Sequence, residues 1–288
     1  MKFLILFLVL VLHKMIWFPR RCGTSRLFLW WLGMWKALPG FARSFAWFQY
    51  GLAVLFPTFL AGWGFYQLEP YLWGLPAAGL EVLLLFYILS HSSISRELKR
   101  YRQDLERGDV QAAYHWAESC LVVPEVRFVN DCEALNQEVI RAVLYRWFQY
   151  FFLMVFWYWL TDVYGLLLAW MTLQYSKKQT EDGLKHSGLY WLEWVPVRLL
   201  GLSYCLSGNM SSGLLVWRKL FWNVGCNSER VLSIVGRQSL KFDSHKHMKM
   251  SEHQRASEEL DSWQMLHIRS MSVWMVVIAS MTISGWLL

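Results

Sequence analysis

The sequence predicts an all-α, multi-pass membrane protein with additional helical segments on the cytoplasmic side. Its 288 residues are 56% hydrophobic and 17% aromatic with 19 tryptophans, which exceeds the usual composition of soluble proteins. Apolar stretches at residues 3–18, 45–66, 71–90 and 271–288 approach the length of a membrane crossing. Basic residues gather in the first loop between them, as is typical of the cytoplasmic face of a membrane.

The charge and the motifs of the sequence indicate which partners the protein has, and the cysteines indicate the state of its thiols. The net charge of +7 in such an apolar chain favours contact with anionic lipid headgroups and a role in topology. No zinc-finger, helix-turn-helix or RNA-binding motif is present in the sequence, so we predict membrane lipids as partners and no nucleic acid. The five cysteines are widely spaced and odd in number, which predicts reduced, packed thiols: Cys22, Cys120, Cys132, Cys205 and Cys226.

Residues 1–90 are predicted to form the N-terminal membrane helices. The stretch 3–18 is similar to a signal peptide but has no small-x-small cleavage site after it, so we expect an uncleaved anchor. Residues 13–44 contain six basic residues and no acidic one, which puts this loop in the cytoplasm and the N-terminus in the periplasm. Segments 45–66 and 71–90 then form a helical hairpin, within which we expect Glu81 to pair with a neighbouring group.

Residues 91–144 are polar enough to form a cytoplasmic helical segment. One apolar helix face recurs at spacings of four, three and four residues, at Ile94, Leu98, Tyr101 and Leu105. Gly108 and Asp109 are suited to end this helix and to cap the next one. We therefore predict two helices joined by a tight Gly-Asp turn.

Residues 145–206 are predicted to be membrane-embedded or re-entrant, and two alternatives remain open. Residues 147–173 are long enough for one tilted crossing, after which 189–206 crosses back. Lys177 and Lys178 oppose export of the loop that joins 147–173 to 189–206. In the alternative, the chain kinks near 161–165 and returns to the cytoplasmic face.

Residues 207–270 carry many basic side chains and are predicted to be cytoplasmic, with a mobile loop at 241–257 and a last membrane helix at 271–288. Three histidines lie in the loop, at His245, His247 and His253. No fourth ligand follows at a suitable spacing, so no metal site is predicted.

Glu193, Pro196 and Arg198 interrupt the apolar run 189–206. Unpaired charges at membrane depth cost several kcal/mol, so we expect burial within the protein or placement at the interface. Either Arg198 binds an anionic ligand, such as a phosphorylated or carboxylated molecule, or it pairs with Glu193 or Asp182. We expect these charges to shape a cytoplasm-facing pocket together with Arg146 or Asp182.

The segment Trp194-Val195-Pro196-Val197-Arg198-Leu199, followed by Leu200-Gly201, resembles the signature of the AmpE family. Residues 227–242 resemble AmpE as well, and the Gly-Asp turn with its Ala-rich helix fits the same pattern. The resemblance implies a regulatory, signalling-modulator protein of the bacterial inner membrane, linked to β-lactamase induction, antibiotic resistance and peptidoglycan recycling. It also implies a CobD/CbiB-like fold and a cytoplasmic peptidoglycan-recycling component as a partner.

The alternative is a divergent membrane-bound cobinamide-phosphate synthase, because AmpE is similar to the CobD/CbiB enzymes and these have a related Pro-Ala-Arg-Leu motif. Synthase activity is associated with an Ala-Glu-Asn-x-x-Asp-Gly…Ala-Pro region and an Asn-Thr-x-Asp segment. Here the matching stretches, 133–138 and 169–174, read EALNQE and AWMTLQ, so most acids and amides for Mg-nucleotide chemistry are replaced. The sequence also lacks common phosphate-loop and hydrolase motifs. We therefore predict no catalytic residue and identify no cofactor, and a regulatory role is favoured over an enzyme.

Overall fold

The computed structural model describes residues 2–15, 25–36, 45–68, 70, 75–90, 95–121, 132–181, 188–240 and 252–284. All regular elements within these ranges are helices, as the composition predicts. The chain forms two compact units, of which one contains Met1–Ser92 and Gln149–Glu193 and the other contains Ser93–Phe148 and Trp194–Leu288.

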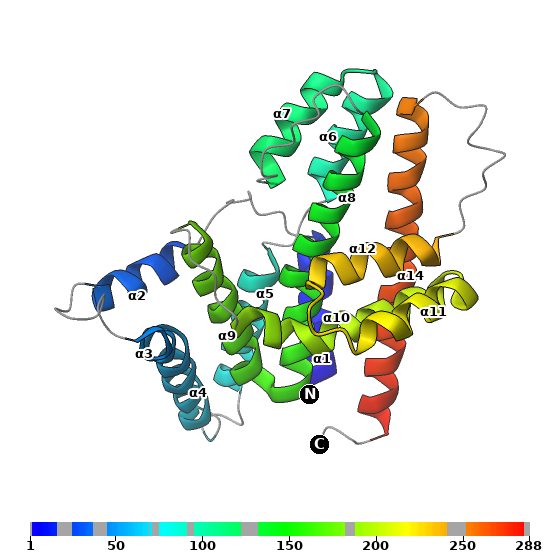
Figure 1. Ribbon diagram of the computed structural model, residues 1–288. Helices are drawn as coiled ribbons and strands as arrows, with labels where there is room; N and C mark the ends of the chain where they lie inside the picture. Colours follow the sequence, from blue (N-terminus) through cyan, green and yellow to red (C-terminus); the bar gives the residue numbers. More distant parts are fainter. Residues whose placement is uncertain are drawn as a thin grey trace. The chain divides into compact units, whose positions relative to one another are not determined.

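The first unit is built around a long apolar helix that packs against helices from the N-terminal part of the chain. Its helices are α1 (Lys2–Met15), α2 (Arg26–Lys36), α3 (Ala46–Tyr50), the π-helix η2 (Gly51–Leu55), α4 (Phe56–Leu68), α5 (Leu75–Leu89) and α9 (Leu153–Glu181). In Figure 1, α9 lies between α4 and α5, and it contacts both of them. The Tyr164 hydroxyl donates to the Gly62 carbonyl at 2.9 Å, and the hydroxyls of Tyr50 and Thr172 lie 2.9 Å apart.

Helix α9 is broken near its middle. Thr161 has φ −134° and ψ 22°, and Asp162 has φ 58° and ψ −148°. A positive φ is uncommon for a residue other than glycine, so the chain changes direction here instead of continuing as one straight helix. The break lies inside the 161–165 segment where the sequence allows a kink.

The second unit consists of a helical hairpin, a long C-terminal helix and four helices around them. Its members are α6 (Ser95–Glu106), α7 (Val110–Leu121), α8 (Cys132–Trp147), most of α10 (Gly188–Ser207), α11 (Met210–Phe221), α12 (Ser228–Ser239) and α14 (Glu252–Ile283). A short π-helix, η5 (Phe148–Phe152), follows α8 in the chain and precedes α9. In Figure 1, α6, α8 and the first half of α14 lie side by side.

The turn between α6 and α7 confirms the predicted Gly-Asp connection. Gly108 has φ 76° and its N–H donates to the Leu105 carbonyl at 2.9 Å, an arrangement that ends a helix at a left-handed glycine. Asp109 then caps α7, because its Oδ1 accepts from the Ala112 N–H at 2.9 Å. Tyr101 and Leu105 from the predicted apolar face are fully buried.

Polar side chains join α14 to α6 and α8. Buried Asn136 donates from Nδ2 to the Glu259 carboxylate at 3.1 Å and to the Ala256 carbonyl at 3.3 Å. Arg102 donates to Glu106 at 2.8 Å and to Asp261 at 2.5 Å. Because buried polar groups are costly without partners, these bonds favour one alignment of the three helices.

Among the residues that the structure describes, three helical stretches are long and apolar enough to cross a membrane: Trp47–Leu68, Glu133–Thr180 and Gln254–Ile283. The shorter Leu75–Leu89 is also apolar. One boundary differs from the sequence prediction, because α14 begins at Glu252 and thus includes part of the 241–257 segment expected to be a loop. The reason is a helical pattern that starts there, since Ala256, Leu260 and Trp263 form one buried face.

Candidate functional site

Helix α10 carries the predicted charged motif and continues through Pro196, which is buried. Proline has no N–H, so the carbonyl four residues earlier, at Leu192, loses its partner within the helix. The indole Nε1 of Trp157 donates to that carbonyl at 3.2 Å. A tryptophan from α9 thus supplies the donor that the proline removes.

Glu193 is only 2% exposed and lies three residues before the proline. Its Oε1 accepts a hydrogen bond from Nε2 of Gln149 at 2.9 Å, and Gln149 is buried as well. Gln149 lies in η5, so this bond links the start of α10 to the π-helical turn before α9. A buried carboxylate needs such donors to offset its desolvation.

Arg198 is 1% exposed, and its guanidinium donates to three backbone carbonyls. Nε reaches the Phe221 carbonyl at 2.8 Å, Nη1 the Trp194 carbonyl at 3.0 Å and Nη2 the Asn223 carbonyl at 3.1 Å. The guanidinium also lies 4.2 Å from the centre of the Trp194 ring. Phe221 ends α11, so the positive charge lies at the end of that helix where carbonyls lack intrahelical donors.

A second hydrogen bond joins α10 and α11. The Trp217 indole on α11 donates to the Arg198 carbonyl at 2.8 Å. Arg198 thus both donates to and accepts from the α11 region. In the structure its described contacts position α11 and the turn that follows it.

The structure does not test the predicted pocket formed by Glu193, Arg198, Arg146 and Asp182. Glu193 and Arg198 are five positions apart, which corresponds to about 140° around an α-helix. Arg146 is half-buried near the end of α8, and Asp182 lies outside the described residues. A shared pocket formed by these charges, and the pairing of Glu193 with Arg198, therefore stay predictions.

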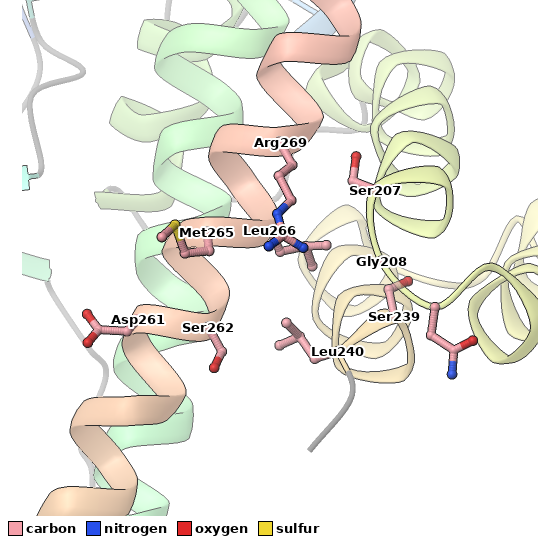
Figure 2. Close-up of a pocket in the computed structure, with 10 residues that line it drawn as sticks. Ser207, Gly208, Ser239, Leu240, Asp261, Ser262, Met265, Leu266 and Arg269 are labelled. Carbon is pink, nitrogen blue, oxygen red and sulfur yellow. The ribbon is translucent and has the colours of Figure 1, made fainter. Parts of the chain in front are cut away.

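Sequence reasoning missed a cavity of ≈ 460 Å³ at the other end of α10 (Figure 2). It lies where α10 ends, α11 begins and α12 ends, beside the middle of α14. The residues that line it are Ser207, Gly208, Asn209, Ser239, Leu240, Asp261, Ser262, Met265, Leu266 and Arg269. The Ser-Gly-Asn sequence at the end of α10 was the one local signal, because the other walls come from distant parts of the chain.

Backbone contacts close one side of this cavity. The Asn209 N–H donates to the Ser239 carbonyl at 2.7 Å, and the Ser212 hydroxyl donates to the Gln238 carbonyl at 2.7 Å. A Cβ at Gly208 would overlap the Ser239 carbonyl, so only glycine allows this approach. The C-terminal end of α12 is therefore held against the junction of α10 and α11.

The stretch 133–138, which differs from the synthases, has a structural role at Asn136, as its bonds to α14 show. Among the described side chains, no three His, Cys, Asp or Glu groups gather closely enough to hold a metal ion. His245 and His247 lie outside the described residues. The described cysteine side chains, Cys205 and Cys226, are free thiols.

Comparison with known proteins shows that a family model matches most of the chain. The sequence model described as "Regulatory signalling modulator protein AmpE" matches residues 51–288. Neither the curated proteins nor the solved structures gave a match.

Proposed function

This chain belongs to the AmpE family of regulatory signalling modulator proteins, and on that premise we propose that it modulates β-lactamase induction from the bacterial inner membrane. The match over residues 51–288 carries this proposal. The three helices that are long and apolar enough to cross a membrane support the location. In this role the protein is a non-catalytic modulator that responds to peptidoglycan recycling through a cytoplasmic partner.

Gene deletion and complementation test the proposal. Deleting the gene should change β-lactamase activity measured after exposure to a β-lactam inducer, and a plasmid copy should restore the parental response. Unchanged induction in the deletion strain would contradict the signalling role. The same plasmid should fail to restore corrinoid synthesis in a strain lacking cobinamide-phosphate synthase, and success there would move the protein into the enzyme class.

The proposed topology has the N-terminus in the periplasm and residues 91–144 and 207–270 in the cytoplasm. The basic loop at 13–44 supports it, because such loops stay on the cytoplasmic side. Four cysteines are then inaccessible to an impermeant thiol reagent added to cells with a permeable outer membrane: Cys22, Cys120, Cys132 and Cys226.

A positive control makes that labelling experiment decisive. Gln67 is exposed at the end of α4, at the predicted outer turn, so Gln67→Cys should be labelled from outside. Labelling of Cys120 in intact cells at the rate of the Gln67→Cys control would contradict this topology. Labelling of the four native cysteines only after lysis would support it.

A further inference from the structure

We propose that the cavity at the end of α10 binds a small hydroxylated molecule carrying a carboxylate or phosphate group, with Arg269 as its anion-binding residue. This inference goes beyond the signalling role. It concerns a direct binding event that can be measured on the purified protein, whether or not β-lactamase induction depends on it.

Arg269 is the charged group in this cavity that is available to a ligand. It is exposed on α14, and within the described parts of the chain its guanidinium makes no hydrogen bond or ion pair. Figure 2 shows its side chain directed along α14 towards Leu266, into the region between α14 and the end of α10. A guanidinium can hold a carboxylate or phosphate through two parallel hydrogen bonds.

The nearby acid does not cancel this charge directly. Asp261 lines the same cavity, but its carboxylate accepts a hydrogen bond from Arg102 at 2.5 Å. Figure 2 shows the Asp261 carboxylate pointing away from Arg269. The cavity therefore combines an available cation with an acid that already has a cationic partner.

Other polar groups suit the remainder of such a ligand. Asn209 accepts from the Ser211 hydroxyl at 2.9 Å through Oδ1, while its Nδ2 donates to no described residue. The Ser262 hydroxyl donates to the Glu258 carbonyl at 2.9 Å, so its oxygen remains an acceptor. One amide donor and one hydroxyl acceptor complement a molecule with hydroxyl groups.

Size and apolar walls limit the ligand further. The volume of ≈ 460 Å³ lies within the range of about 300–1,000 Å³ that is usual for small-molecule sites. Leu240, Met265 and Leu266 supply an apolar surface against which a sugar ring or a short aliphatic chain can pack. The chemistry thus fits a molecule the size of a sugar phosphate or a sugar acid.

Equilibrium dialysis of the full-length protein in phosphatidylcholine nanodiscs tests the proposal. The probes are radiolabelled glucose 6-phosphate and glucuronate, with glucose as the neutral control. We expect at least one anion to bind at least tenfold more tightly than glucose. Equal binding of all three sugars, or no binding of either anion to the folded protein, would overturn the proposal.

Two pairs of variants assign the binding to this cavity. Arg269→Gln should weaken the anion at least tenfold, while Arg255→Gln, an exposed change on the same helix, should not. Asn209→Asp should also weaken it, because it adds a negative charge to the lining of the cavity. Asn227→Asp changes another helix N-cap outside the cavity and should have no effect.

Aspartate and asparagine are similarly good N-caps, so the Asn209 variant should fold even if an Arg269 variant does not. Unchanged binding in folded Arg269→Gln or in Asn209→Asp would overturn the assignment.

The anion can come from a soluble molecule or from a lipid headgroup, and nanodiscs containing phosphatidylglycerol distinguish the two. Loss of probe binding there supports a headgroup in the same cavity, and retained binding supports a soluble ligand.

Discussion

We expect Arg198→Met to lower the free energy of unfolding by about 3 kcal/mol. Methionine fills much of the space of the arginine stem but cannot donate to the carbonyls of Trp194, Phe221 and Asn223. Hydrogen bonds to charged groups contribute about 1.5–3 kcal/mol each. Asn223 is exposed, so water can donate a hydrogen bond to its carbonyl in place of the arginine. Trp194 lies inside α10, so the helix backbone can satisfy its carbonyl.

The main loss is then the bond to Phe221 at the end of α11, together with the stacking on Trp194. A desolvated guanidinium over an indole ring contributes about 1–2 kcal/mol, which brings the total to about 3 kcal/mol. Arg198→Lys should lose less, because an ammonium keeps the charge but not the fork of donors. SDS titration of the purified protein in detergent, followed by circular dichroism, measures these differences.

Arg218→Met is the matched control, because Arg218 is exposed on α11 and should change stability by less than about 0.5 kcal/mol. If Arg198→Met unfolds at the same SDS fraction as this control, the capping argument is refuted.

A double variant tests the proposed pairing of Glu193 with Arg198. Removing one member of a buried pair costs about 3–5 kcal/mol, whereas replacing both by apolar residues is often close to neutral. We expect the double change to leucine to recover only part of the loss, because the Phe221 carbonyl still lacks its donor. No recovery would contradict the pairing, and full recovery would contradict the role of the carbonyl contacts.

Two further predictions concern the second unit, with a control in the first. Gly236→Ala should lower the free energy of unfolding by about 1–3 kcal/mol, because the new methyl overlaps the buried Trp263 ring. Gly33→Ala, whose new methyl lies in open space, should stabilise α2 by about 0.5–1 kcal/mol. Thermal unfolding in detergent compares the two variants. The hydrogen bond from Arg102 lowers the pKa of the Glu106 carboxyl below its ordinary value of 4.5. The stabilising contribution of this carboxylate is therefore complete above pH 4.5 and is lost as the pH falls through the lowered pKa. Melting curves should therefore depend less on pH below about 4.5 in Glu106→Gln than in the parent, and equal slopes would contradict this contribution.

Composition and local pattern determined the class of this protein and several of its connections. Apolar runs without strand alternation predict membrane helices, because a chain in lipid must satisfy its backbone hydrogen bonds internally. The turn at Gly108 and Asp109 was predictable because a left-handed glycine and an N-cap act within a few residues of themselves. The break at Asp162 falls where the charge pattern allowed a kink, although only the structure locates it.

Tertiary structure decided which partners the polar groups found. The sequence marked Arg198 as unusual but suggested an acid or a ligand, whereas the described hydrogen bonds go to the carbonyls of Trp194, Phe221 and Asn223. Backbone carbonyls leave no residue-type signal, so such a partner cannot be read from a sequence.

The cavity at Arg269 was hidden for a related reason. Its walls come from the ends of α10 and α12 and from the middle of α14, which are separated by long stretches of chain. Each wall looks locally like an ordinary helix end or a solvated helix face. The packing of those helices places an arginine without a described partner in the same cavity as Asn209. Helix packing depends on side-chain shape across the whole unit, so a local pattern does not predict it.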